Sequence, residues 1–369
     1  MVTPKPLRVG IVGTGAIAQK HLAAILPHAD QVVISAICDP NTSALETFGA
    51  FVPDAKRFTA VDDLIASGVI DAGIIATPHF LHFSQAFSFA SASIPVLVEK
   101  PLVTTLDQLR QLRDIADKTG TLVVAGQMHR FDRTNVLGRR WLDLDSSRFG
   151  ALESFELHCW QDITEYTEQV GLSHWLLNGE LAGGGVIVSL AIHQLDLLRF
   201  LGGTDYAEVS AKGLLSAPFH AGAESSASVL VTMQNGATGS MFASYTAPRR
   251  FASESVTLFG QNGGLTRQLR GLGTYLGPLL YAPAHDIEGV IDFSAAAAAD
   301  AGVAAIDAGL VADLGPERFE NQILHFTHAV RGDVEPLNTL AQNFNSIACI
   351  DAINQSLRES GRPIAVASE

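Results

Sequence analysis

The first third of the chain alternates short apolar runs with longer segments of helical pattern. The apolar runs are rich in β-branched side chains and end at glycine, proline or polar residues, which is typical of buried strands. Their alternation with helices predicts βαβ units around a parallel sheet. The predicted strands are 9–12, 32–39, 69–76, 96–98 and 122–125, and the predicted helices are 16–26, 42–51, 80–93 and 106–119.

The pattern changes after residue 126, so we expect two domains, 1–126 and 127–369. The turn Gln234-Asn235-Gly236 separates two strand-like runs and predicts a hairpin. Residues 275–318 are rich in alanine and glycine and predict a helix-containing insertion. Strands are predicted at 151–162, 225–233, 238–246 and 256–259, helices at 319–331 and 340–360, and an edge strand at 364–366.

The bulk composition narrows the classes of partner. Of 369 residues, 47% are hydrophobic and 17% charged, and the formal net charge is −14. No basic stripe is present to meet phosphates, so we expect no nucleic acid partner. No apolar run approaches the ~20 residues of a membrane span, and the first residues lack the apolar region of a signal peptide, so we expect neither membrane nor secretion. Three widely spaced cysteines fit a reducing cytoplasm and predict no metal site.

A glycine loop joins the first predicted strand to the first predicted helix. Residues 7–18, LRVGIVGTGAIA, have the G-x-G-x-x-A form of a dinucleotide-binding loop. Gly13 permits the tight turn, Gly15 lets the backbone approach a pyrophosphate, and Ala18 lets helix and strand pack closely. The helix directs its free N–H groups and positive dipole end at the phosphates. A tight turn without a ligand is the alternative, but the position between a strand and a helix favours dinucleotide binding.

Asp39 ends the second predicted strand, about 20 residues past the loop, where an acidic residue binds the ribose hydroxyls of a dinucleotide. A carboxylate there would repel a 2′-phosphate, so NAD is favoured, with NADP possible. The alternative is a helix-capping or turn aspartate, because Pro40-Asn41-Thr42 follows. Both roles are compatible.

Polar residues follow the other predicted strands as well. Ligands of parallel sheets lie beyond the carboxyl ends of the strands. Lys100 follows the predicted strand 96–98 and Glu99, at the edge of the expected cofactor cleft. At this position it can donate a hydrogen bond to a substrate oxygen or, if burial lowers its pKa, transfer a proton. A solvated lysine paired with Glu99 is the alternative, and Pro101 restrains the backbone of Lys100. The residues at these strand ends are Gly13, Asp39, Thr77, Glu99 and Gln127.

Several motifs together resemble those of the Gfo/Idh/MocA oxidoreductases. They are the glycine loop, Asp39, the stretch ATPHFLH at 76–82 and the tripeptide Glu99-Lys100-Pro101. Residues 180–202 are similar to the glycine-rich helix of that family, and 319–366 to its usual ending. The resemblance implies a doubly wound Rossmann domain followed by an α/β domain with an open, largely antiparallel sheet. It also implies a homodimer or homotetramer.

The glycine-rich helix departs from the family pattern Gly-Gly-Gly-x-x-x-Asp-x-Gly-x-His. The glycines 183–185 and His193 are present, but Ser189 stands at the Asp position and Ala191 at the later Gly position. The resemblance implies that Lys, Asp and His together bind and transfer the proton of the hydroxyl group that is oxidised. Serine keeps a hydrogen-bonding group but removes the negative charge.

The resemblance implies Lys100, Ser189 and His193 as catalytic residues. Ser189 and His193 are spaced i, i+4 and are expected on one helix face, with Asp196 orienting the imidazole. The glycine run is expected to let the helix start approach the cofactor. Substrate contacts are predicted for Lys100, His193, Trp175 and Trp160, although sheet packing is the alternative for Trp160. The predicted cofactor-binding residues are Gly13, Thr14, Gly15, Ala16, Ile17, Asp39, Thr77, Pro78, His82, Glu99, Lys100 and Gln127.

These features predict an NAD(P)-dependent oxidoreductase. Its hydride would pass between nicotinamide and a secondary alcohol or ketone of a sugar, cyclitol or glycoside. One alternative is a glycosidase or epimerase that holds and recycles NAD. Another is a nucleotide-binding protein that lost catalysis at Ser189.

Overall fold

The computed structural model describes residues 5–271, 274–275, 278–284, 290–293, 314–315 and 317–369. The chain forms two compact units. Unit 1 comprises Met1–Met128 and Glu317–Phe344, and unit 2 comprises His129–Pro316 and Asn345–Glu369. The change from unit 1 to unit 2 lies close to the predicted boundary at 126, but the later segment of unit 1 was expected in the second domain.

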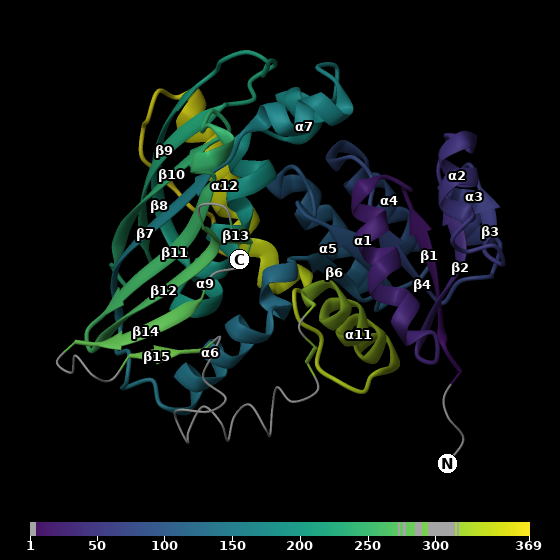
Figure 1. The fold of residues 1–369 in the computed structure, drawn as a ribbon, viewed down its shortest axis with the longest axis horizontal. Helices are drawn as coiled ribbons and strands as arrows, with labels where there is room; N and C mark the ends of the chain where they lie inside the picture. Colours follow the sequence, from purple (N-terminus) through teal and green to yellow (C-terminus); the bar gives the residue numbers. More distant parts are fainter. Residues whose placement is uncertain (1–4, 272–273, 276–277, 285–289, 294–313, 316) are drawn as a thin grey trace. The chain divides into compact units, whose positions relative to one another are not determined.

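Unit 1 contains a parallel sheet of six strands in the order β3-β2-β1-β4-β5-β6 (Figure 1). This order confirms the doubly wound sheet, and its direction of winding reverses between β1 and β4. β3 was not predicted, because a three-residue strand with Lys56 and Arg57 exposed has no apolar run. The strands are β1 (Leu7–Val12), β2 (Val32–Cys38), β3 (Lys56–Phe58), β4 (Ala72–Ile75), β5 (Val96–Glu99) and β6 (Val123–Gly126).

Helices cover both faces of this sheet. On one face, Ala18 and Leu22 of α1, Phe48 of α2 and Phe326 of α11 join one buried apolar cluster with the strands. On the other, Phe89 of α4 packs so closely that a Cβ on Gly73 would lie 2.3 Å from its ring. The helices are α1 (Ala16–Ile25), α2 (Thr42–Gly49), α3 (Val61–Ala66), α4 (His79–Ser91), α5 (Leu106–Thr119) and α11 (Arg318–Arg331).

The segment Glu317–Phe344 belongs to unit 1 for two physical reasons. Helix α11 supplies Ile323 and Phe326 to the apolar cluster around α1. Beyond it, the carbonyl of Asn338 accepts the N–H of Ala125 at 2.8 Å, so the returning chain pairs with edge strand β6. Neither contact can be read from local sequence pattern.

Unit 2 contains a broad mixed sheet in the order β15-β14-β12-β11-β7-β10-β9-β8-β16, with β13 paired to β12 (Figure 1). All described pairs are antiparallel except β7 with β10, which confirms a mainly antiparallel sheet. The strands are β7 (Leu152–Trp160), β8 (Tyr206–Leu214), β9 (Ser226–Met233), β10 (Thr238–Ser244), β11 (Ser253–Gly260), β12 (Gly263–Gly271), β13 (Thr274–Tyr275), β14 (Leu279–Pro283), β15 (Ile291–Asp292) and β16 (Ile364–Ala365).

Several predictions for this unit are confirmed. Antiparallel β9 and β10 flank Gly236, whose φ is +87°, so the hairpin is present. β16 lies at the end of the sheet as an edge strand. Within 275–318, the described parts include strands β14 and β15, and most of the predicted insertion lies outside the described residues.

One face of the unit 2 sheet is buried and the other is open. Phe155, Leu157 and Cys159 of β7 are buried, and helix α9 packs on β7 and β11. On the other face, Leu230 and Phe242 are 66% and 44% exposed. The helices of this unit are α6 (Arg133–Leu144), α7 (Ile163–Val170), α8 (Gly179–Ala182) and α9 (Ile192–Gly202), and α12 (Leu340–Arg358) begins in unit 1 and ends in unit 2.

The helical stretch Gly179–Gly202 is long and apolar enough to cross a membrane by length and composition, which the sequence reasoning did not anticipate. However, 89% of its apolar window is buried inside the structure. A buried core helix passes the same test of length and composition.

Candidate functional site

Gly13 ends β1 and turns the chain sharply. Its φ is +86°, and a Cβ on it would lie 2.7 Å from the carbonyl oxygen of Ala76, so a larger residue is excluded. Its N–H donates to the carbonyl of Cys38 at 2.8 Å. The loop is therefore fixed against the ends of both neighbouring strands, β2 and β4.

The N-terminus of α1 follows this turn and is open. Gly15 is the N-cap residue and offers no side-chain cap, and the first turn contains no acidic residue. A Cβ added to Gly15 would meet nothing within 4 Å, and Ala16 is exposed. Because helix N-termini carry unpaired N–H groups and a positive dipole end, this place fits a diphosphate.

Asp39 holds the glycine loop from the end of β2. Its Oδ2 accepts from both the main-chain N–H and the Oγ1 of Thr14, each at 2.9 Å. Its Oδ1 accepts the N–H of Asn41 at 2.9 Å, as expected for a turn aspartate. The turn role is thus present, and the predicted contact with a ribose stays a prediction.

His82 of α4 joins the ends of two strands. Its Nε2 lies 2.8 Å from the carbonyl oxygen of Thr77, which follows β4, and its Nδ1 lies 2.7 Å from that of Pro101, which follows β5. Burial lowers the pKa of His82, against the two carbonyl contacts, which raise it. The ring has no exposed surface, so an effect of His82 on a cofactor would pass through the main chain that it holds.

Glu99 and His21 form a buried pair beside Lys100. The Oε1 of Glu99 lies 2.9 Å from the Nε2 of His21, and its Oε2 accepts the main-chain N–H of Lys100 at 3.2 Å. Glu99 thus contacts the backbone of Lys100, whose own side chain is partly exposed. The Lys100–Pro101 peptide bond is cis.

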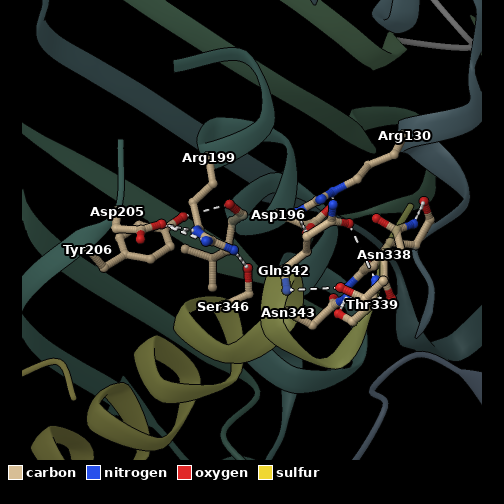
Figure 2. A network of polar contacts seen from close by, with 12 residues as sticks. Arg130, Asp196, Arg199, Asp205, Tyr206, Asn338, Thr339, Gln342, Asn343 and Ser346 are labelled. Atoms are coloured by element: carbon tan, nitrogen blue, oxygen red, sulfur yellow. Dashed lines mark hydrogen bonds and ion pairs between the residues drawn. The ribbon is translucent and has the colours of Figure 1, made fainter. Parts of the chain in front are cut away.

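Gln127 follows β6 and is 2% exposed. Its carbonyl oxygen accepts from the Nδ2 of Asn338 at 3.3 Å, and Figure 2 labels Asn338 beside Thr339 and Asn343. Among the described residues, none gives a hydrogen bond to the buried Oε1 of Gln127. This oxygen is an acceptor at the carboxyl end of the sheet, and the predicted cofactor contact of Gln127 stays a prediction.

In unit 2, two glycines of the run 183–185, Gly184 and Gly185, are packed closely against other residues. A Cβ on Gly185 would lie 2.0 Å from the carbonyl oxygen of Glu224. The carboxylate of Glu224 accepts the N–H groups of Gly185 and Ile187 at 2.8 and 2.9 Å. Burial raises the pKa of Glu224. Gly185 thus makes room for Glu224, and the approach of these glycines to the cofactor stays a prediction.

Ser189 lies in a π-helical segment, Ile187–Ala191, that precedes α9. Its Oγ donates to the carbonyl of Gly185 at 2.6 Å and lies 3.0 Å from the hydroxyl of Tyr245. The predicted regular helix through Ser189 and His193 is thus interrupted by a π turn, a feature frequent at functional sites. His193 is 6% exposed, and its ring meets that of His129 edge-on at 4.8 Å.

Asp196 forms a buried bidentate pair with Arg130 (Figure 2). The two hydrogen bonds measure 2.8 and 2.7 Å and occupy both carboxylate oxygens. We expected Asp196 to orient His193, but the structure gives its carboxylate to Arg130. Sequence reasoning missed Arg130, Tyr245 and Glu224, because each partner lies far away along the chain.

The two predicted substrate-binding tryptophans lie elsewhere in unit 2. Trp160 stacks on His158 with ring centroids 4.5 Å apart, and His158 contacts Ser253 and Ser255 on β11. These contacts favour the sheet-packing alternative for Trp160. Trp175 begins a short 3-10 helix whose N-cap is His174, and its substrate contact stays a prediction. Among the described residues, no group of three or more His, Cys, Asp or Glu could hold a metal ion.

Taken by itself, unit 1 has the strand order, glycine turn and open helix N-terminus of a dinucleotide-binding domain. Residues 7–127 match the family model described as "Oxidoreductase family, NAD-binding Rossmann fold". Residues 143–266 match that described as "GFO/IDH/MocA C-terminal domain". The chain belongs to the Gfo/Idh/MocA family of oxidoreductases.

Two relatives and one solved structure illustrate the similarity. The chain is 27% identical to inositol 2-dehydrogenase of Corynebacterium glutamicum (strain R), over 63% of this chain and 65% of that protein. It is 29% identical to 1-carboxy-3-chloro-3,4-dihydroxycyclo hexa-1,5-diene dehydrogenase of Comamonas testosteroni, over 53% of this chain and 47% of that protein. Both alignments thus cover less than two thirds of the relative's own length.

The solved structure is the WlbA dehydrogenase of Bordetella pertussis in complex with NADH and UDP-GlcNAcA. The TM-score is 0.80 at 24% identity, over 99% of this chain and 100% of that one. At this identity the likeness shows the fold.

Proposed function

We propose that this protein is an NAD-dependent dehydrogenase or reductase that acts on a secondary alcohol, or the matching ketone, of a cyclitol, sugar or glycoside. The observation that carries the proposal is the open N-terminus of α1, which follows the turn at Gly13 and Gly15. Asp39 holds this turn by accepting the N–H of Thr14. When bound, the nicotinamide supplies hydride transfer.

Residues of unit 1 would hold the dinucleotide. The first-turn N–H groups of Ala16 and Ile17 would face the diphosphate, and the carboxylate of Asp39 would face the adenosine ribose. Its negative charge favours NAD over NADP. Gln127 would offer its Oε1 as an acceptor.

Lys100 and His193 would act on the substrate oxygen. The ammonium group of Lys100 would donate a hydrogen bond to that oxygen and stabilise negative charge on it. The imidazole of His193 would accept or return the proton of the hydroxyl. Ser189 would contribute through hydrogen bonds alone, because its hydroxyl replaces the carboxylate of the family pattern.

A screen of cyclitols, sugars and glycosides with NAD and NADP, followed by absorbance at the reduced-nicotinamide band, tests the activity. Lys100→Ala and His193→Ala should each lower kcat/KM by about a hundredfold or more, since general acid–base groups typically contribute 10²–10⁴-fold. Lys118→Ala, at an exposed lysine of α5, is the control. Wild-type turnover by both variants would end the assignment.

The Ser189 geometry favours a second candidate, a nucleotide-binding protein without turnover. Ser189 is already engaged by Gly185 and Tyr245, and the position lacks a carboxylate. Binding of NADH without turnover of any compound in the panel would support this function. Gain of turnover in Ser189→Asp would show that the missing carboxylate at position 189 causes the lack of activity. The NAD-recycling glycosidase or epimerase stays a prediction, tested by retention of NAD through purification and by product formation without net NADH.

We also propose that the chain forms a homo-oligomer in the cytoplasm. The open sheet face with Leu230 and Phe242 exposed supports association, because large exposed apolar side chains often mark interfaces. Light scattering of wild type and Leu230→Glu would test it, with a smaller particle expected for the variant.

A further inference from the structure

The turn Glu99-Lys100-Pro101 is held on both sides of its lysine by buried imidazoles. Before Lys100, the carboxylate of Glu99 contacts the Nε2 of His21 at 2.9 Å. After it, the carbonyl of Pro101 contacts the Nδ1 of His82 at 2.7 Å. Both rings are 0% exposed. The lysine itself is partly exposed, and the backbone on both sides of it is held by these contacts.

The two rings come from helices that begin beside the candidate nucleotide site. His21 lies on α1, which starts directly after Gly15. His82 lies on α4, which starts after Thr77-Pro78, and its other nitrogen contacts the Thr77 carbonyl at 2.8 Å. A neutral imidazole donates from one nitrogen only, so His82 hydrogen-bonds either the Pro101 or the Thr77 carbonyl and lies close to the other.

Contacts in the core hold His21 in place. Its ring meets Phe319 of α11 edge-on, with centroids 5.5 Å apart and an interplanar angle of 87°. Glu99 receives the His21 contact on Oε1 and the N–H of Lys100 on Oε2, so one carboxylate links the ring to the lysine backbone. Among the described residues, the Nδ1 of His21 has no hydrogen-bond partner, so Glu99 is the polar contact of this buried ring.

We infer that His21 and His82 are positioning residues that fix Lys100 relative to the nucleotide loop, His21 through Glu99 and His82 through the Pro101 carbonyl. The inference rests on the proposed function, in which Lys100 meets the substrate oxygen. Neither imidazole touches substrate in this scheme. Their effect is on the place of the Lys100 ammonium, and small misplacements of a catalytic group are costly in rate.

The variants separate positioning from general stability. His21→Phe and His82→Phe keep a planar ring but remove the polar contact, whereas His21→Gln and His82→Gln keep one amide donor for Glu99 or a carbonyl. Thr121→Val is the matched control, because its buried hydroxyl donates to the Ala90 carbonyl at 3.1 Å before β6, at the opposite end of the sheet.

Three measurements are made on the full-length protein: kcat and KM on the substrate found in the screen, NADH affinity by calorimetry, and the ¹³C signal of Lys100 after reductive methylation. The Lys100 signal is assigned by its loss in Lys100→Arg. We expect the Phe variants to lower kcat by about tenfold to a hundredfold, and His21→Phe to keep NADH affinity within about threefold of wild type. Their Lys100 signal should move, and the Gln variants should restore part of both effects.

The control should lower the melting temperature without moving kcat or the Lys100 signal. An unmoved Lys100 signal in folded His21→Phe and His82→Phe would overturn the inference, as would kcat changes no larger than in Thr121→Val. If a Phe variant does not fold, its Gln counterpart carries the same two readouts. Failure of the proposed function is distinct, because it appears as unchanged turnover in Lys100→Ala. The position of Lys100 is read separately, from its methyl signal in wild type and in the histidine variants.

Discussion

One carboxylate oxygen of Asp39 accepts both the main-chain N–H and the hydroxyl of Thr14, each at 2.9 Å. The acidic residue at the end of β2 therefore shapes the glycine loop before any ligand binds. Asparagine removes the charge and keeps one acceptor oxygen, which can still accept from Thr14, whereas its NH2 group cannot accept the N–H of Asn41.

Asp39→Asn should keep the contacts with Thr14 and lose the one with the N–H of Asn41. It should also weaken discrimination against the 2′-phosphate, so the ratio of NADP to NAD affinity should rise. Asp39→Ala should weaken both nucleotides and lower the free energy of unfolding by about 1–3 kcal/mol, because Thr14 loses its acceptor. Calorimetry with both nucleotides and urea unfolding measure these effects. Asp54→Asn, an exposed charge change, is the control, and an unchanged nucleotide ratio in Asp39→Asn would contradict the ribose role.

Gly15→Ala should separate binding from stability. A methyl group there meets nothing within 4 Å, and φ is −75°, so the fold should keep or gain about 0.4–1 kcal/mol of stability. The same methyl would occupy the space in front of the α1 N-terminus, so NAD affinity should fall by tenfold or more, on the order of 1.4 kcal/mol.

Gly13→Ala gives the contrasting outcome, since its Cβ would meet the Ala76 carbonyl and its φ is +86°. It should lose both stability and binding. Thermal melts and NADH calorimetry on the two variants test the pair. Full NAD affinity in Gly15→Ala would argue against a diphosphate at this helix end.

Removing one partner of the Arg130–Asp196 pair should destabilise unit 2 strongly. Asp196→Ala leaves a buried guanidinium without its carboxylate, and such losses typically cost about 3–5 kcal/mol. The double variant Arg130→Met/Asp196→Leu should recover most of this loss, because it removes both charges. Urea unfolding of the single and double variants gives the coupling, and additive effects would show that the pair contributes little.

Stability should fall as the pH drops below about 6.5. Burial lowers the pKa of His82, His158 and His325 from the ordinary value of 6.5. Below that value the unfolded chain takes up protons that the native state does not, so the free energy of unfolding decreases, by at most about 1.4 kcal/mol per pH unit for each histidine. Above it, all forms are neutral and these groups contribute no pH dependence.

His158→Asn should reduce this slope, because an asparagine amide does not titrate. Exposed His220→Asn is the matched control. Unfolding in urea between pH 7.5 and about 5 measures the difference. A slope equal to that of wild type in His158→Asn would contradict a lowered pKa at that position.

The sequence was informative where the cause of structure is local. The apolar runs and the Gly13-Thr14-Gly15 turn predicted the wound sheet and the open helix end, because strand burial and backbone φ leave a residue-level signature. The Asn235-Gly236 turn likewise predicted its hairpin. Contacts that join distant segments left no such trace: Glu224 beneath Gly185, Arg130 on Asp196, and Asn338 on strand β6.

The π turn at Ser189 shows the same limit at the candidate catalytic helix. Apolar periodicity there fits an ordinary α-helix, whereas the structure has a π turn whose residues contact Tyr245 and Glu224 from other elements. The carboxylate of Asp196 is likewise bound by Arg130 and not by His193. The predicted roles of the glycine run, Lys100 and His193 remain proposals.

Unit 1 is completed by α11 and Asn338, which are synthesised only after the intervening residues 129–316. Unit 1 therefore stays incomplete during much of translation. At roughly 5–20 residues per second, a nascent chain would wait on the order of ten seconds or more with the outer edge of β6 and the apolar side of α1 uncovered on the ribosome. Most of unit 2 is therefore synthesised, and has time to begin folding, before unit 1 can be completed.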